Sequence, residues 1–96
     1  MCRLFDKVLE LVENDLYVVG IHAAERLEER GIMERQAVSG LLENAELLAE
    51  RMDSLPNPSV EVREILPDGT AFKCVWSVLP ESGVAKLVTV HFFDLS

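Results

Sequence analysis

Two short turn segments divide the second half of this 96-residue chain. Pro67-Asp68-Gly69 and Pro80-Glu81-Ser82-Gly83 separate three strand-prone runs, at roughly 60–66, 70–79 and 84–93. Connections this short join neighbouring antiparallel strands in hairpins. The pattern therefore predicts a three-stranded antiparallel meander.

Hydrophobic residues alternate along the second and third of these strands. One face of 70–79 carries Phe72, Cys74, Trp76 and Val78. Strand 84–93 is apolar on both faces, with Val84, Lys86, Val88, Val90 and Phe92 on one and Ala85, Leu87, Thr89, His91 and Phe93 on the other. Such a strand is expected inside the sheet, with helices on one side and another layer, such as a second subunit, on the other.

The first half of the chain has a helical pattern. Apolar residues recur at intervals of three and four over 3–13, 21–30 and 34–43. Gly20 can cap the start of the second helix, and Gly31 can end it. We therefore predict three helices before the meander.

Two further segments complete the layout. Residues 16–19 are strand-prone, and 46–52 fits a helix or a strand, of which we favour the strand. Together the patterns predict an α+β fold with three helices packed on one face of a three- or four-stranded antiparallel sheet. A chain of this length is expected to form one domain over 1–96, in which 1–15 is an N-terminal helical extension.

Acidic residues outnumber basic ones by 17 to 9, which gives a net charge of −8. This charge opposes nonspecific binding to nucleic-acid phosphates and anionic membranes. The charged N-terminal segment and the lack of a long apolar run predict neither a signal peptide nor a membrane span. The two distant cysteines fit a reducing compartment. We therefore expect a cytoplasmic protein with no membrane partner.

The segment 20–32 contains the main candidate site. At about 100° per residue, a helix here places His22, Arg26 and Arg30 along one stripe, beside an apolar arc and an acidic one. Arg26 and Arg30 are like charges four residues apart, so something should compensate them. Glu29 pairs favourably with Arg26 within the helix.

Other partners for the two arginines must come from outside the helix. Acidic side chains in or after the sheet are the structural candidates, namely Glu61, Glu64 or Asp94. A bound anion is the functional alternative. The sequence favours the structural partners.

Histidine supplies the acid–base chemistry. His22 lies in the first helical turn, where the helix dipole favours a neutral imidazole that can accept a proton. If the fold brings His91 opposite His22, the two could divide the base and acid roles, with Arg26 and Arg30 stabilising a phosphate between them. Such a set of residues would cleave RNA without a metal, with the 2′-hydroxyl of the RNA as the nucleophile. A hydrogen-bonded structural role for either histidine is the simpler alternative.

Metal and cofactor chemistry has little support in the sequence. Cys2, His22, Cys74 and His91 could ligate zinc, but they lack the close pairs of a structural zinc site. The chain has neither a phosphate-binding glycine loop nor a Gly-x-Ser-x-Gly turn. We therefore predict no metal and no cofactor.

The run from His22 to Ile32, followed by Val38, Leu41-Leu42 and Val88-Thr89-Val90, resembles the bacterial family called domain of unknown function 4258. The resemblance covers roughly residues 16–94. It implies a His-Ala-x-Glu-Arg helix, an Arg-Gly-Ile turn, a second helix and a small antiparallel sheet. It also implies a fold similar to the small RelE-like and barnase-like ribonuclease toxins, and hence RNA cleavage.

Carried over by position, the family's histidine, two arginines and glycine fall on His22, Arg26, Arg30 and Gly31. His91 stands where the family usually places an aromatic hydroxyl, so the role of that position does not transfer directly.

Three functions remain open. The first is a metal-independent endoribonuclease of toxin type, with His22, Arg26, Arg30 and His91 as its catalytic residues and RNA as its partner. The second is a noncatalytic module that binds another protein or a second copy of itself, using Trp76 and Phe92-Phe93 as anchors. The third is a binder of a small anion or phosphate ligand on the same basic stripe.

Overall fold

Five strands form one sheet in the computed structural model, which describes residues 3–53 and 57–93. The elements are, in chain order, α1 (Leu4–Glu13), β1 (Tyr17–Val19), α2 (Ile21–Glu29), α3 (Glu34–Asn44), β2 (Glu46–Arg51), β3 (Ser59–Ile65), β4 (Ala71–Leu79) and β5 (Val84–Phe92). The predicted helices and C-terminal strands match these bounds to within one residue at each end. The segment 46–52 is a strand, as favoured from the sequence.

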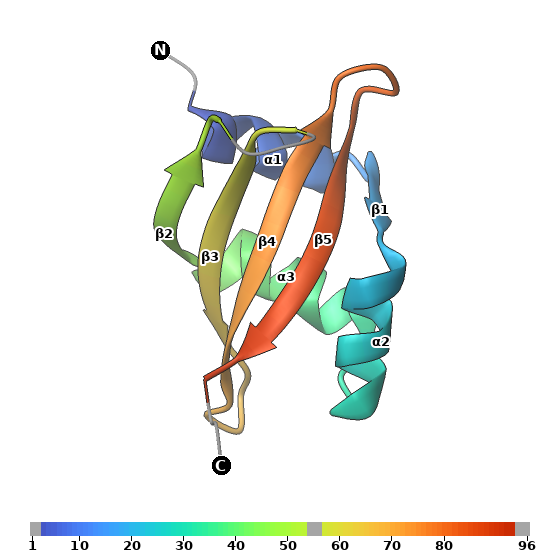
Figure 1. Ribbon diagram of the computed structural model, residues 1–96. Helices are drawn as coiled ribbons and strands as arrows, with labels where there is room; N and C mark the ends of the chain where they lie inside the picture. The colour runs from blue at the N-terminus through green and yellow to red at the C-terminus, as the bar shows by residue number, and fades with distance from the viewer. Residues whose placement is uncertain (1–2, 54–56, 94–96) are drawn as a thin grey trace.

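The strands lie in the order β1-β5-β4-β3-β2, with β1 parallel to β5 and the other neighbours antiparallel (Figure 1). The predicted α+β class, the three helices and the antiparallel pairing of neighbouring strands from β2 to β5 are confirmed, but the sheet has a fifth strand, which is parallel to its neighbour. The additional strand, β1, has only three residues and pairs with a segment far along the chain. No local turn pattern predicts such a pairing.

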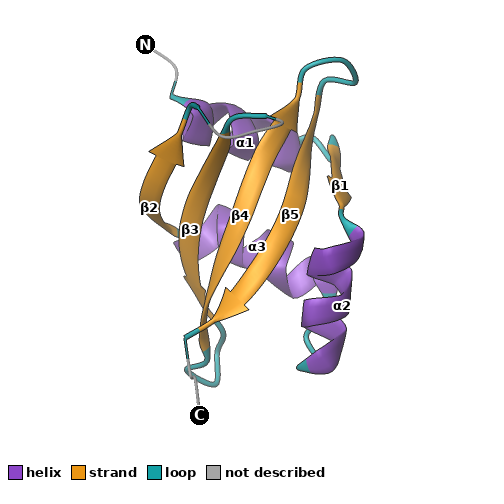
Figure 2. Cartoon of the chain, viewed as in Figure 1, coloured by secondary structure: helices purple, strands orange, loops and turns teal. Residues whose placement is uncertain are grey.

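Two helices cover one face of the sheet, and the third lies at its edge. Figure 2 shows α1 and α3 behind the sheet, whereas α2 continues the line of β1 alongside β5. The face opposite α1 and α3, here called the open face, carries no helix among the described residues. Only two of the three helices thus occupy the predicted position on one face.

The hydrophobic core lies between the sheet and α1 and α3, with α2 closing one side. It includes Val8 and Leu41 from the helices and Phe72, Cys74 and Trp76 from β4. Trp76 is fully buried, and its ring meets Tyr17 edge-on at 6.3 Å between centroids. Trp76 is therefore a core residue, and its predicted role as an interface anchor was wrong.

A β-bulge explains why the last strand is apolar in both alternating positions. The β4–β5 register shifts between Val75 and Trp76, so that Val88 is skipped. Ala85 and Leu87 face the core before the shift, and Val90 does so after it. The strand lies inside the sheet as predicted, but the uninterrupted alternation was wrong. Its core-facing residues change register once, because a bulge adds one residue to one strand.

Local backbone geometry fixes α2 against β5. Gly20 precedes the helix and its N–H donates to the Leu87 carbonyl at 2.9 Å. A Cβ on Gly20 would lie 3.0 Å from that same oxygen, a tight contact that would push the helix away from β5 by a few tenths of an ångström. Ala23 and Leu27 then enter the core. Gly31 ends the helix with a φ of +68°, a conformation that costs glycine little.

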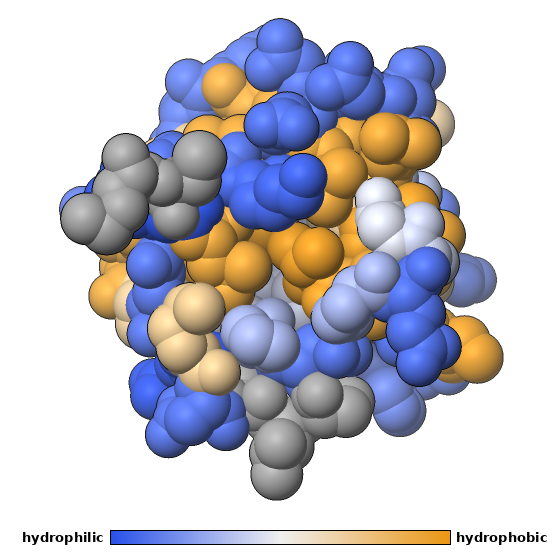
Figure 3. Space-filling model, turned by 90° about the horizontal axis from the view of Figure 1, so that it is seen from above, coloured by the Kyte–Doolittle hydropathy of each residue, from blue (hydrophilic) through white to orange (hydrophobic). Residues whose placement is uncertain are grey.

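The end of the molecule near α1 and the β4–β5 hairpin has a mixed surface. Hydrophobic side chains lie between hydrophilic ones in this view, without separating into two halves (Figure 3). Among the described residues, no helix is long and apolar enough to span a membrane.

Candidate functional site

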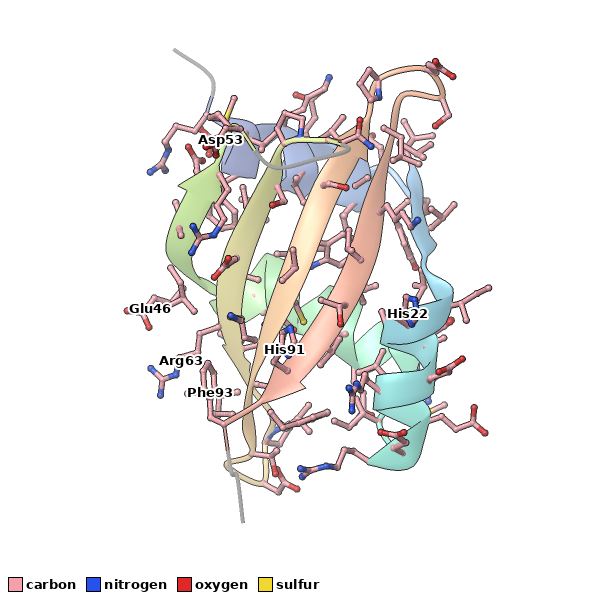
Figure 4. All side chains as sticks on the ribbon, viewed as in Figure 1. His22, Glu46, Asp53, Arg63, His91 and Phe93 are labelled. Carbon is pink, nitrogen blue, oxygen red and sulfur yellow. The ribbon has the colours of Figure 1, made fainter. Side chains whose placement is uncertain are left out.

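The two candidate catalytic histidines lie on neighbouring elements. His22 is in the first turn of α2, and His91 is near the end of β5 (Figure 4). Both side chains are exposed, and no hydrogen bond or ion pair of the described residues involves either of them. α2 packs beside β5, and Figure 4 shows the two side chains apart, His22 at the start of α2 and His91 near the end of β5.

The two arginines of the α2 stripe have different surroundings. Arg26 pairs with Glu29 at 3.6 Å, as the sequence predicted. Arg30 follows the last residue of the helix, and its guanidinium carbon lies 4.3 Å from the centroid of the Phe92 ring. A cation over an aromatic face gains about 0.5–1 kcal/mol at exposed sites. Phe92 therefore contributes to holding Arg30 at the edge of the sheet.

The acidic partners predicted for these arginines are mostly engaged elsewhere. Glu61 contacts Arg51 and Lys73 on the open face. Glu64 is buried on the other side of the sheet. The prediction was therefore wrong for both glutamates, and Asp94 lies outside the described residues.

A row of basic side chains crosses the open face. Arg63 on β3, Lys73 on β4 and His91 on β5 are successive cross-strand partners. Glu46 on β2 is the next partner beyond Arg63, and the two side chains form an ion pair at 3.2 Å. We call Arg63, Lys73 and His91 the basic row.

The open face has the opposite charge balance from the whole chain. The side chains that the strands place on this face are the basic Arg51, Arg63, Lys73 and Lys86 and the acidic Glu46 and Glu61, whereas Glu50 and Glu64 point to the other face. The complete chain has a net charge of −8. Most of the acidic residues therefore lie elsewhere, and this face is locally positive.

Glu61 is the centre of an ion cluster on this face. Its carboxylate accepts hydrogen bonds from Arg51 and, at 3.4 Å, from Lys73. The hydrogen bond from Arg51 is the main reason that the pKa of Glu61 falls below its usual value. Burial acts in the opposite direction, and the charge of Lys73 lowers the pKa further. The cluster links β2, β3 and β4 through side chains.

An exposed aromatic ring lies near the basic row. Phe93 directly follows β5 and is 48% exposed. Figure 4 shows Phe93, His91 and Arg63 towards the same end of the sheet. Exposed aromatic rings beside cations can stack on nucleobases while the cations bind phosphates.

A second site, at Glu64, was not predicted from the sequence. This side chain is 1% exposed, and neither of its oxygens has a hydrogen-bond partner among the described residues. Burial raises the pKa of Glu64 to about 8, and the thiol of Cys74 offsets a smaller part of that rise. A carboxyl of this kind is protonated at neutral pH.

The sequence did contain a signal for this buried carboxyl. Glu64 follows Val60 and Val62 at the same spacing of two, and all three face the core from β3. Opposite it lies Gly40, a glycine in the middle of α3, where a Cβ would come within 2.5 Å of the Glu64 Oε1. An inward-facing charge and a helical glycine together could have indicated the site.

The residues considered for zinc do not come together. Cys74 is a free thiol buried in the core, while His91 is exposed on the open face. Cys2 lies outside the described residues. Within 3–53 and 57–93, no three His, Cys, Asp or Glu side chains are grouped in a way that could hold a metal ion.

Comparison with known proteins assigns a family to this chain. The model of the family described as Domain of unknown function (DUF4258) matches residues 21–92, from the start of α2 to the end of β5. The searches of curated proteins and of solved structures found no match. The matched segment includes α2, the basic row and Glu64, and leaves α1 and β1 outside. Because the match covers most of its length, the chain belongs to the DUF4258 family.

Proposed function

We propose that this protein binds single-stranded RNA on the open face of its sheet and cleaves it without a metal ion. The observation that carries the proposal is the basic row, in which Arg63, Lys73 and His91 line up across three strands on an uncovered face. In a chain of charge −8, a locally positive face favours phosphate binding there over the rest of the surface.

Arg63 can exchange its present partner for a phosphate, whereas Lys73 can add a phosphate contact through ammonium hydrogens that Glu61 does not use. Arg63 pairs with Glu46, whose side chain is 65% exposed, and Lys73 pairs with Glu61. Exposed ion pairs contribute about 0–1 kcal/mol, so a phosphate can compete for Arg63 at little cost. The adjacent ring of Phe93 offers a stacking surface for a base.

Two histidines suffice for the proposed chemistry. One imidazole removes the proton of a 2′-hydroxyl, whose oxygen attacks the neighbouring phosphorus. The bond to the 5′-oxygen breaks, and that oxygen takes a proton from the other imidazole, leaving a 2′,3′-cyclic phosphate. We assign these roles to His91 and His22, and charge stabilisation to Lys73 and Arg26. Arg30 is not included, because it stacks on Phe92, which packs against the core on the other face of the sheet. The resemblance to small ribonuclease toxins supports the same reaction, as an analogy.

Cleavage of a labelled single-stranded RNA in EDTA tests this proposal. We expect the wild type to generate cyclic-phosphate ends, and His91→Ala or His22→Ala to slow cleavage by about 100-fold or more. Arg35→Ala is the matched control, since Arg35 belongs to α3 on the other side of the sheet. RNA binding that depends on Lys73 but is not followed by cleavage would refute the nuclease hypothesis and support phosphate binding alone. Absence of binding would refute both.

A second candidate function, a protein-interaction module, has its own observation. The sheet ends at β1, and exposed apolar residues lie along this edge, namely Leu16, Val18 and Ile21. Ile21 is 75% exposed at the start of α2. A strand edge with apolar neighbours can add a strand from a partner. Light scattering after size exclusion tests the homo-oligomeric form, which predicts a dimer that Ile21→Glu converts to a monomer.

A further inference from the structure

A pocket opens between α3 and the β3–β4 hairpin, on the side of the sheet away from the open face. Its volume is about 480 Å³, which falls in the range of small-molecule sites. The lining includes Gly40, Glu43, Glu64, Leu66 and Phe72. Most of the lining surface is apolar, so the pocket suits a ligand with an apolar body.

Glu64 gives this pocket a specific chemistry. Its two carboxyl oxygens are buried and have no hydrogen-bond partner of normal geometry among the described residues, and the neighbouring thiol of Cys74 is only a weak donor. Leaving a buried polar group unpaired is unfavourable, and more so if the group is charged. A ligand that brings N–H donors to this carboxyl recovers that cost. The site is therefore set up for a donor group.

Once Glu64 is ionised, the charges around the pocket favour a cationic donor. Glu64 and Glu43 contribute acidic groups from β3 and α3, and Arg35 is the basic residue of the lining. The fully buried Phe72 adds an aromatic ring beside Glu64. A planar cation with two parallel N–H groups matches the two oxygens of a carboxylate, as in charge-assisted bidentate pairs.

We propose that this pocket binds a small organic cation, an amidine or amine on an aromatic or aliphatic body, through an ion pair with Glu64. Gly40 makes room for the carboxyl, since a Cβ at that position would come within 2.5 Å of its Oε1. The pocket and the open face lie on opposite sides of the sheet, so this site is independent of the proposed RNA-binding surface.

Binding should release a proton. At neutral pH the Glu64 carboxyl is protonated, because burial raises its pKa to about 8. Pairing with a cation requires the ionised form, so the proton leaves as the cation binds. At pH 7 the expected release is about 0.9 proton for each cation bound. A neutral ligand in the same pocket would release none.

Isothermal titration calorimetry with benzamidine tests the inference on the whole chain. Titrations at pH 7 in phosphate and in Tris buffer give the number of protons released, because the buffers differ in ionisation enthalpy. We expect one site, release of about one proton, and at least about a tenfold loss of affinity in Glu64→Gln. Glu10→Gln, an acid-to-amide change on exposed α1, should bind as the wild type does.

Three results with benzamidine would overturn this site, and a fourth comes from a neutral comparison. They are absence of benzamidine binding to the wild type at about 10 mM, equal binding by Glu64→Gln, and binding without proton release. Benzyl alcohol is the neutral comparison, and equal affinity for it would indicate a purely apolar pocket. Circular dichroism must confirm that Glu64→Gln is folded. If the variant is unfolded, the number of protons released by the wild type decides whether the ligand pairs with Glu64. None of these measurements depends on RNA.

Discussion

Glu64 continues the inward series of Val60 and Val62 but brings a carboxyl into the core. Its folded-state pKa of about 8 lies above the ordinary value of 4.5. The folded state therefore holds a proton that the unfolded state loses between these values. The stability associated with this group is fully present below pH 4.5 and is lost as the pH rises towards 8.

Glu64→Gln should remove this pH dependence. The amide does not titrate. Within this window the free energy of unfolding of the wild type should therefore fall, relative to that of the variant, by about 1.4 kcal/mol for each pH unit. Urea denaturation at pH 5 and pH 8 measures both values. A difference between wild type and variant that is the same at the two pH values would contradict the raised pKa.

Gly40 and Glu64 should be coupled energetically. Replacing a helical glycine with alanine normally stabilises a helix by about 1 kcal/mol. Here the added methyl group would meet the Glu64 carboxyl, so Gly40→Ala should instead destabilise the fold by about 1–3 kcal/mol. In a Glu64→Ala background the same change should become neutral or stabilising. Urea denaturation of the four proteins gives the coupling, and simple additivity would refute it.

At the scale of elements, side chains on the open face tie neighbouring strands together. Glu61 on β3 bridges Arg51 on β2 and Lys73 on β4, and its side chain is 16% exposed. Its pKa lies below the ordinary value, so the stabilisation is present above pH 4.5 and is lost as the pH falls through the folded-state pKa.

Glu61→Gln should therefore destabilise the sheet at pH 7 by about 1–2 kcal/mol. The loss should shrink when the carboxyl of the wild type is protonated in acid. Glu46→Gln is the matched control, since its pair with Arg63 is much more exposed and should contribute below about 0.5 kcal/mol. Equal effects of the two changes in thermal unfolding would show that the half-buried Glu61 bridge contributes no more than the exposed pair.

Elements with local signals were predictable, and those without were not. The hairpins at Pro67-Asp68-Gly69 and Pro80-Glu81-Ser82-Gly83 join antiparallel strands as predicted, because turn chemistry is local. The bulge at Val88 was not predicted from the sequence, because it depends on how two strands fit each other and the helices beneath. The only sign of the bulge in the sequence is that apolar residues occupy both alternating faces of the strand.

At the scale of the whole molecule, charge is distributed unevenly. The chain carries −8 overall, yet basic residues predominate on the open face. RNA binding on this face should therefore weaken as salt rises, since bound phosphates release counterions.

Lys73→Ala should reduce that salt dependence if Lys73 contacts a phosphate. The slope of log K against log salt concentration should become shallower by about 0.7 for one lost contact with single-stranded RNA. Fluorescence anisotropy over a series of salt concentrations measures the slope. Arg35→Ala should leave it unchanged, and an unchanged slope in Lys73→Ala would place the RNA elsewhere.

The candidate site was predictable in its parts but not in its assembly. Helical periodicity placed His22 and Arg26 on one stripe and predicted the pair of Arg26 with Glu29, which is confirmed. Strand alternation could not relate His91 to Lys73 and Arg63, because that requires the register of three strands. The basic row is thus a product of strand pairing.

The sequence by itself determined the helix and strand bounds, the two hairpins and the glycine stop at Gly31, because each depends on neighbouring residues. Only the tertiary structure decided the parallel pairing of β1 with β5, the place of α2 at the sheet edge and the burial of Glu64 against Gly40. These features join segments distant in the chain, and their energies arise from packing and desolvation that appear only when the segments meet.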